Sequence, residues 1–185
     1  MEKEKEMNQW EYGLTPEEEA ICAKVGYERQ LPYMGKPEMN RNYSEGDVWE
    51  MWQHAVAAGS ELAFARMIGF NDFVPHVNKW RLEEDVPGFE IRYSFSRQNM
   101  RNLERLRMHE LDDDNKKYIL LVDGLSIKTR RTAENGWVGA PYRAQGWAYG
   151  HEAKKDEFIY QGHGKYKTWY LPVHYLHPMS ELGLQ

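Results

Sequence analysis

The first 70 residues carry the apolar spacing and the capping residues of helices. Thr15 is followed by a proline and then by Glu18, a capping box with proline at the first helical position, so we predict a helix to about Arg29. Ser44 is the expected N-cap of a second, longer helix that ends at Gly69. The predicted core-facing stripe of that helix is Val48, Trp52, Ala55, Val56, Gly59, Leu62 and Ala63.

After this helix the spacing changes to that of strands. Residues 89–95 alternate, so that Glu90 and Arg92 share one face and the apolar side chains share the other. The apolar run over residues 118–122 (YILLV) predicts a strand that is covered on both faces. Further strands are predicted over residues 73–80, 103–109, 144–149 and 168–173, and a short helix over residues 151–157.

These elements predict an α/β (α+β) fold in which one long helix packs on a central mixed, largely antiparallel sheet. Residues 31–43 hold two prolines and a glycine and indicate a linker. We therefore expect an acidic N-terminal extension with one accessory helix over residues 1–43. An α/β domain then occupies residues 44–185.

The composition narrows the class of protein. Hydrophobic residues make up 41% of the 185 residues, enough for one core. No apolar run approaches the roughly 18 residues of a membrane span, and the N-terminus lacks a secretory pattern, so we expect a cytoplasmic protein without a membrane partner. Cys22 is the single cysteine, which excludes an internal disulfide and a cysteine-based zinc site within one chain. No glycine-rich nucleotide-binding motif occurs in the sequence.

Charge is distributed unevenly along the chain. The net charge of −5 argues against a protein that coats nucleic acid by bulk charge. Residues 1–19 hold seven Glu against two Lys, and this acidic end would suit a protein partner. Residues 92–107 hold five Arg and a single Glu. The arginines that follow Arg92 in this strip are Arg97, Arg101, Arg105 and Arg107. On charge alone, the acidic end and this strip can be two solvated surfaces.

Three carboxylates are expected to converge near the alternating strand. Glu90 and Arg92 lie about 7 Å apart along one face of that strand, and Asp85 lies in the turn that leads into it. Glu61 lies on the long helix and approaches both acids when that helix packs along the sheet. Converging carboxylates repel each other unless a cation lies between them, and oxygen ligands favour Mg²⁺ or Mn²⁺. The predicted metal ligands are Glu61, Asp85 and Glu90.

The order of a helical Glu61, then Asp85, then Glu90-Ile91-Arg92 on a strand resembles the PD-(D/E)XK nuclease superfamily. The signature of that superfamily is a helical Glu, an Asp and a Glu-x-Lys strand. A narrower resemblance, to small uncharacterised phage proteins of the superfamily, is carried by residues 59–63 (GSELA), 85–92 (DVPGFEIR), 119–124 (ILLVDG), 146–154 (GWAYGHEAK) and 170–173 (YLPV).

The resemblance covers roughly residues 45–179 and implies a restriction-endonuclease-like core. It also implies hydrolysis of DNA phosphodiester bonds with Mg²⁺ or Mn²⁺, in the host cytoplasm for a phage-encoded chain. Glu61, Asp85, Glu90 and Arg92 are the implied catalytic residues. A nuclease would use the basic strip to hold DNA phosphates, so the predicted DNA-binding residues are Arg97, Arg101, Arg105 and Arg107.

The sequence departs from the superfamily pattern at three points. Glu84 replaces the proline before the aspartate, and the short gap between Asp85 and Glu90 requires a tight turn. Arg92 replaces the lysine, and because arginine stays protonated it can orient water or clamp phosphate but cannot act as a general base.

Each candidate residue also has a structural interpretation. Glu90 and Arg92 fit a cross-strand charge pattern, Asp85 fits a turn cap, and Glu61 fits a surface helix position. Two further functions stay open on the sequence alone. One is a catalytically inactive nuclease-fold accessory or inhibitor protein that binds DNA or a host protein. The other is a virion or assembly component that uses the aromatic-rich C-terminus as an interface.

Overall fold

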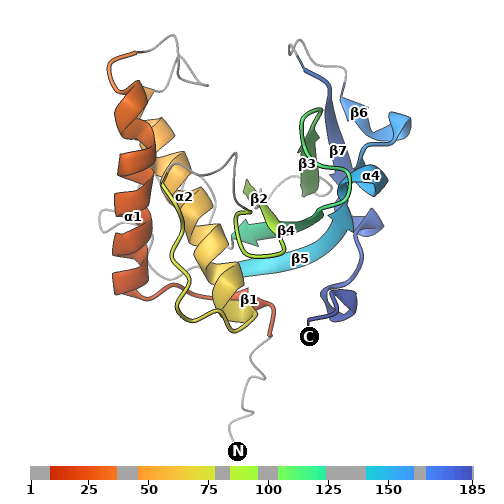
Figure 1. The fold of residues 1–185 in the computed structure, drawn as a ribbon, viewed down its shortest axis with the longest axis horizontal. Helices are drawn as coiled ribbons and strands as arrows, with labels where there is room; N and C mark the ends of the chain where they lie inside the picture. The colour runs from red at the N-terminus through yellow and green to blue at the C-terminus, as the bar shows by residue number, and fades with distance from the viewer. Residues whose placement is uncertain are drawn as a thin grey trace, which may run out of the picture.

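The structure of the protein, a computed structural model, describes residues 9–36, 46–77, 84–95, 104–123, 141–160 and 166–184 (Figure 1). The helices in these ranges are α1 (Pro16–Gln30), α2 (Gly46–Met67) and the short α4 (Gly150–Ala153). The strands are β1 (Glu11–Tyr12), β2 (Glu90–Phe95), β3 (Arg105–His109), β4 (Lys117–Asp123), β5 (Tyr142–Tyr149), β6 (Ile159–Tyr160) and β7 (Thr168–Pro172).

The strands form two sheets. In the first sheet the order is β1-β5-β4-β2, with β2 parallel to β4 and the other pairs antiparallel. In the second sheet β3, β7 and β6 pair antiparallel. The chain therefore leaves the first sheet after β2, forms β3 in the second sheet, and returns as β4 beside β2. The predicted mixed α/β class with mixed sheets is confirmed.

Helix α2 packs on the first sheet and α1 packs alongside α2, where the sequence predicts one long helix on the sheet (Figure 1). The predicted capping box starts α1: the Glu18 N–H donates to Thr15 Oγ1 at 3.2 Å, and the Thr15 N–H donates to Glu18 Oε2 at 3.1 Å. Buried Cys22 and Val25 of α1 form a cluster with two residues of α2. The helical layer thus includes α1. Residues 37–45, with most of the predicted linker and the Ser44 cap, lie outside the described ranges.

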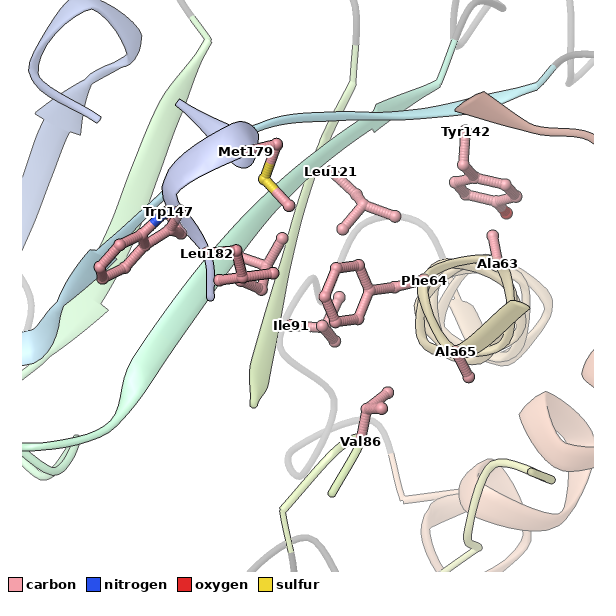
Figure 2. Packing of buried hydrophobic residues seen from close by; sticks show 11 residues of the cluster. Ala63, Phe64, Ala65, Val86, Ile91, Leu121, Tyr142, Trp147, Met179 and Leu182 are labelled. Carbon is pink, nitrogen blue, oxygen red and sulfur yellow. The ribbon is translucent and has the colours of Figure 1, made fainter. Parts of the chain in front are cut away.

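The main core lies between α2 and the first sheet. Phe64 of α2 points toward Ile91 of β2 and Leu121 of β4 (Figure 2). Met179 and Leu182, from the C-terminal segment, are buried in the same cluster. This core places Ile91 on the inner face of β2, so the alternating residues Glu90 and Arg92 point to the other face.

A second core fills the space between the two sheets. Tyr118 and Leu120 of β4 pack there with buried residues of β3 and β7, while the intervening Ile119 belongs to the main core. Strand β4 is therefore buried on both faces, as its continuous apolar run predicts.

The strand predicted over residues 73–80 is wrong for the described residues 73–77, which form no strand; residues 78–80 lie outside the described ranges. Arginine side chains bind the backbone of this segment. Arg66 donates to the carbonyls of Phe70 (2.8 Å) and Phe73 (3.3 Å), and Arg29 donates to the carbonyl of His76. These carbonyls are therefore satisfied without a ladder of strand hydrogen bonds.

Smaller differences concern element ends. Val48 was predicted to face the core but is 74% exposed, because the buried apolar residues of α2 start at Ala55, about two turns later. The helix predicted over residues 151–157 is divided into α4 and a 3-10 turn at Asp156–Phe158. Strands β1 and β6 are not predicted by the sequence pattern. No helix within the described ranges has both the length and the apolar character needed to cross a membrane.

The contact between α1 and α2 gives a stability prediction. A Cβ atom on Gly26 would lie 2.5 Å from Ala55 Cβ and 2.7 Å from Ala55 Cα. We expect Gly26→Ala to lower the free energy of unfolding by about 1–3 kcal/mol, because the overpacking outweighs the better helix propensity of alanine. Urea unfolding measures the change. Gly13→Ala, which meets no atom within 4 Å, is the matched control. A Gly26→Ala variant as stable as wild type would contradict this packing.

Candidate functional site

A tight turn places Asp85 beside the start of β2. The Val86 N–H donates to the Phe89 carbonyl at 3.1 Å, and the Phe89 N–H donates back at 2.7 Å. Gly88 adopts a φ of 87°, which a side chain would strain. Asp85 Oδ2 then accepts the N–H of Ile91 at 2.8 Å. This turn closes the short gap between Asp85 and Glu90 in the manner that the spacing requires.

Glu90 is held by a lysine from the neighbouring parallel strand. Lys116 lies immediately before β4, and its Nζ atom is 2.6 Å from Glu90 Oε1. The parallel register, with Glu90 opposite Tyr118, brings the start of β4 beside the start of β2. The Glu90 side chain is only 15% exposed, so this ion pair is largely shielded from water.

Arg92 occupies the centre of an acidic environment. Its Nη2 atom is 3.0 Å from Asp112 Oδ1, and its Nη1 atom is 3.7 Å from Asp85 Oδ2 and 3.9 Å from Glu90 Oε2. The guanidinium carbon lies 4.9 Å from the centre of the Tyr118 ring. Three carboxylates therefore surround one arginine whose planar group also stacks on an aromatic ring.

Glu61 is buried in α2 with 5% of its surface exposed. Arg29 of α1 binds it in a bidentate manner, with Nη1 to Oε1 at 3.0 Å and Nη2 to Oε2 at 2.9 Å. The same guanidinium donates to the His76 carbonyl, at 2.9 Å from Nε and 2.6 Å from Nη2. His76 Nε2 in turn lies 2.9 Å from the carbonyl of Glu84, the residue before Asp85. Glu61 is therefore linked to the turn of the site and is not a surface helix residue.

The charges of the predicted carboxylates affect the pKa values of Glu61 and Glu90. Burial raises the pKa of Glu61 to about 7; Arg29 opposes this shift, while the charges of Asp85 and Glu90 add to it. Burial also raises the pKa of Glu90, and the charge of Asp85 adds to this shift against the hydrogen bond from Lys116. Glu61, Asp85 and Glu90 therefore act on one another, although they come from a helix, a turn and a strand.

We call Glu61, Asp85, Glu90 and Arg92, together with their partners, the carboxylate cluster. Sequence reasoning did not identify the three partners, which are Arg29, Asp112 and Lys116. Arg29 lies in the helix that was interpreted as an accessory element, and no local pattern connects it to Glu61. Asp112 and Lys116 lie in the polar segment of residues 111–117 (LDDDNKK). Many charged residues directly before an apolar strand were the one sequence feature that could have indicated these two site residues.

The predicted arginine strip is described only in part. Arg97 and Arg101 lie outside the described ranges. Arg105 and Arg107 lie on β3 in the second sheet, and neither forms an ion pair with a described residue. The strip is therefore not in direct contact with the carboxylate cluster at these two positions.

The carboxylates of the cluster are bound to cations of the chain itself. Within the described ranges, no group of three or more His, Cys, Asp or Glu side chains is arranged so that it could hold a metal ion. Glu61 accepts two hydrogen bonds from Arg29, and Glu90 accepts one from Lys116. A divalent cation would therefore have to replace arginine or lysine contacts at these oxygens.

The buried Glu61 predicts that stability depends on pH. Because its pKa in the folded state, about 7, lies above that of an unfolded glutamate, its stabilising contribution is complete below about pH 4.3 and is lost as the pH rises through 7. We expect the free energy of unfolding of wild type, relative to Glu61→Gln, to fall by about 3 kcal/mol between pH 4 and pH 8. Urea unfolding in EDTA measures this difference.

The control for this experiment is Ser60→Ala, on the same turn of α2. Ser60 is buried and does not titrate, so its substitution should change stability by the same amount at each pH. Parallel pH profiles for wild type and Glu61→Gln would show that Glu61 does not titrate in this range.

Comparisons of the chain with models of protein families, with curated proteins and with solved structures find no match. The resemblance to the PD-(D/E)XK superfamily thus stays a prediction from the sequence. The residues of the cluster and their chemistry are the basis for the function proposed next.

Proposed function

We propose that this protein is a metal-dependent nuclease of the PD-(D/E)XK type that hydrolyses phosphodiester bonds in DNA. One observation carries the proposal. The charges of Asp85 and Glu90, before and at the start of β2, act on the buried Glu61 of α2, and the charge of Asp85 acts on Glu90. Their order on a helix, a turn and a strand is the order of the superfamily signature. A restriction-endonuclease-like core, with α2 against a mixed sheet, is part of the proposal.

The donor set fits a hard divalent cation by its chemistry. Carboxylate oxygens are the ligands that Mg²⁺ and Mn²⁺ prefer, and Asp85, Glu90 and Glu61 would hold the ion. Burial raises the pKa values of Glu61 and Glu90 and the neighbouring carboxylates add to the shift, and a bound cation would oppose both effects. When bound, such an ion polarises a phosphate and lowers the pKa of a coordinated water.

Two cations of the chain take different roles in this proposal. Arg92 holds Asp112 and is close to Asp85 and Glu90, and those charges raise its pKa although burial alone would lower it. It therefore stays charged and serves to fix the carboxylates and to contact phosphate. Lys116, at 2.6 Å from Glu90, stands where an ammonium group would orient water or stabilise the charge that develops on the phosphate. It takes the place of the lysine that Arg92 replaces in the signature.

The arginine strip is assigned to the DNA backbone in this proposal. Arginine binds phosphate in a bidentate manner, and backbone contacts position a nuclease without selecting a sequence. The assigned residues are Arg97, Arg101, Arg105 and Arg107.

A second function is favoured by the Arg29–Glu61 ion pair. Its bidentate geometry, in a buried place, occupies both oxygens of one proposed metal ligand. A nuclease fold that has exchanged its metal for an internal arginine would bind DNA or a protein without cutting DNA. Metal dependence separates this catalytically inactive accessory protein from the nuclease.

The proposal predicts that metal stabilises the fold. If the cluster takes up Mg²⁺ or Mn²⁺, a concentration a hundredfold above the dissociation constant adds about 2.7 kcal/mol to the free energy of unfolding. For a chain of this size we expect the Tm to rise by roughly 5–10 °C. Calorimetry at 0 and 10 mM Mn²⁺ measures the shift. Glu90→Gln should abolish the shift, whereas exposed Glu157→Gln should retain it. An equal shift in both variants would place the metal elsewhere.

Cleavage tests the chemistry separately from metal binding. We expect wild type to degrade DNA in Mn²⁺, and Asp85→Asn or Glu90→Gln to reduce the rate by on the order of a hundredfold or more, because each removes a charged ligand. Lys116→Met should also reduce the rate but should preserve the rise in Tm with Mn²⁺. Time courses on single-stranded, duplex and supercoiled DNA measure these rates. If wild type binds DNA and cuts none of the three substrates, the inactive accessory protein becomes the preferred function.

A further inference from the structure

The three-stranded sheet has two chemically different faces. Leu106 and Met108 of β3, with Trp169 and Leu171 of β7, are buried in the second core. Strand alternation places the intervening residues on the opposite face. We call this the outer face, and it includes Arg105, Arg107, Tyr160, Thr168 and Tyr170.

The register aligns cationic and aromatic side chains across the outer face. Arg107 is directly opposite Tyr170, with its guanidinium carbon 6.0 Å from the centre of the tyrosine ring. The ring of Tyr160 meets Tyr170 edge to face, at 5.1 Å between ring centres. Tyr160 is 57% exposed, and Arg107 is exposed as well. An arginine and two tyrosines from three neighbouring strands thus lie next to one another in turn.

The charge of the outer face differs from that of the whole chain. The protein has a net charge of −5, yet none of the residues in β3, β6 and β7 is acidic. Glu110 follows β3, and its Oε2 atom accepts the backbone N–H of Lys167 at 3.4 Å. Arg105 and Arg107 form no ion pair with described residues, and Arg105 Nε has no hydrogen-bond acceptor among them. The Arg105 Nε atom is buried, whereas Arg107 is exposed, so its guanidinium group is available to an anionic ligand.

From this arrangement we propose that the outer face binds single-stranded nucleic acid. Unpaired bases stack on Tyr160 and Tyr170, and Arg105 and Arg107 contact the phosphates. Exposed aromatic rings interleaved with cations on a sheet are the chemistry that holds single strands, because every unpaired base presents a flat face. In a duplex these faces are covered by neighbouring base pairs. The inference rests on the proposed function in taking DNA as the nucleic acid.

The outer face also leads toward the carboxylate cluster. Strand β3 ends at His109, whose N–H donates to Asp112 Oδ2 at 2.7 Å. The other oxygen of Asp112 is 3.0 Å from Arg92. The end of β3 therefore lies beside the residue that binds Arg92. Together with the proposed function, a face that binds unpaired bases makes single-stranded DNA, or a single-stranded end, the expected substrate.

Binding without cleavage tests the inference. The wild-type chain in EDTA is titrated with fluorescein-labelled 16-nucleotide oligothymidine and with a 16-base-pair duplex, and anisotropy gives each Kd. We expect the single strand to bind more tightly. Tyr170→Ala should weaken its binding roughly tenfold or more, and Tyr170→Phe should retain it, since stacking needs the ring and not the hydroxyl. Arg107→Gln should reduce the slope of log K against log salt by about 0.7.

The matched control is Tyr27→Ala, an exposed tyrosine on α1, which should bind as wild type does; thermal unfolding establishes that each variant is folded. If Tyr170→Ala and Arg107→Gln leave the Kd for oligothymidine unchanged, the inference is overturned. It is also overturned if these two substitutions alter only self-association in sedimentation, because the outer face is then a protein interface. Cleavage in Mn²⁺ that is insensitive to both substitutions would keep the nuclease and reject the outer face. Binding that is weakened by both substitutions, in a protein that does not cleave DNA, would support the outer face and reject the nuclease.

Discussion

The ion pair between Arg29 and Glu61 is the contact on which the arrangement of the helices and the site depends. Two charges that leave water are stable only if their hydrogen bonds are satisfied, and here both carboxylate oxygens are bound by one planar guanidinium. The same guanidinium also binds the carbonyl of His76. One arginine of α1 thereby fixes the position of α2 and of the segment that leads into the Asp85 turn. Removing either partner would leave a buried charge without compensation.

The same principle of compensation extends through the cluster. Glu90 is neutralised by Lys116, and Arg92 is neutralised by Asp112 with help from Asp85. Each charge comes from a different segment, so the cluster holds those segments together as well as presenting reactive groups. A metal ion entering here would compete with contacts that also maintain the fold. On the proposed function, activity and stability would therefore be coupled at this site, and the metal affinity would be set by the difference between the two sets of contacts.

Local patterns predicted the elements well, and they predicted the partners of the site residues poorly. The capping box of α1 and the apolar run of β4 are local signals, and both have the predicted structure. The alternation around Glu90 correctly places Ile91 in the core. Lys116 could not be assigned, because its proximity to Glu90 follows from a parallel pairing between strands that are separated by β3. Arg29 is further away in sequence, and its partner depends on how two helices pack. Such non-local contacts cannot be recognised from the periodicity of a single sequence, which indicates the elements but not how they pair.

The connection between β2 and β4, which contains β3, contributes residues both to the carboxylate cluster and to the outer face. Between the parallel strands β2 and β4 the chain must travel back along the sheet, and β3 lies in this connection as part of a second sheet. Its apolar side chains pack in the second core with Tyr118, and its arginines therefore lie on the other side, where Arg107 is exposed and Arg105 is half-buried. The return segment then delivers Asp112 and Lys116 to β2. Because side chains alternate, a shift of β3 by one residue would bury its arginines and expose its core residues. The register that stabilises the second core therefore also determines which cations face a ligand.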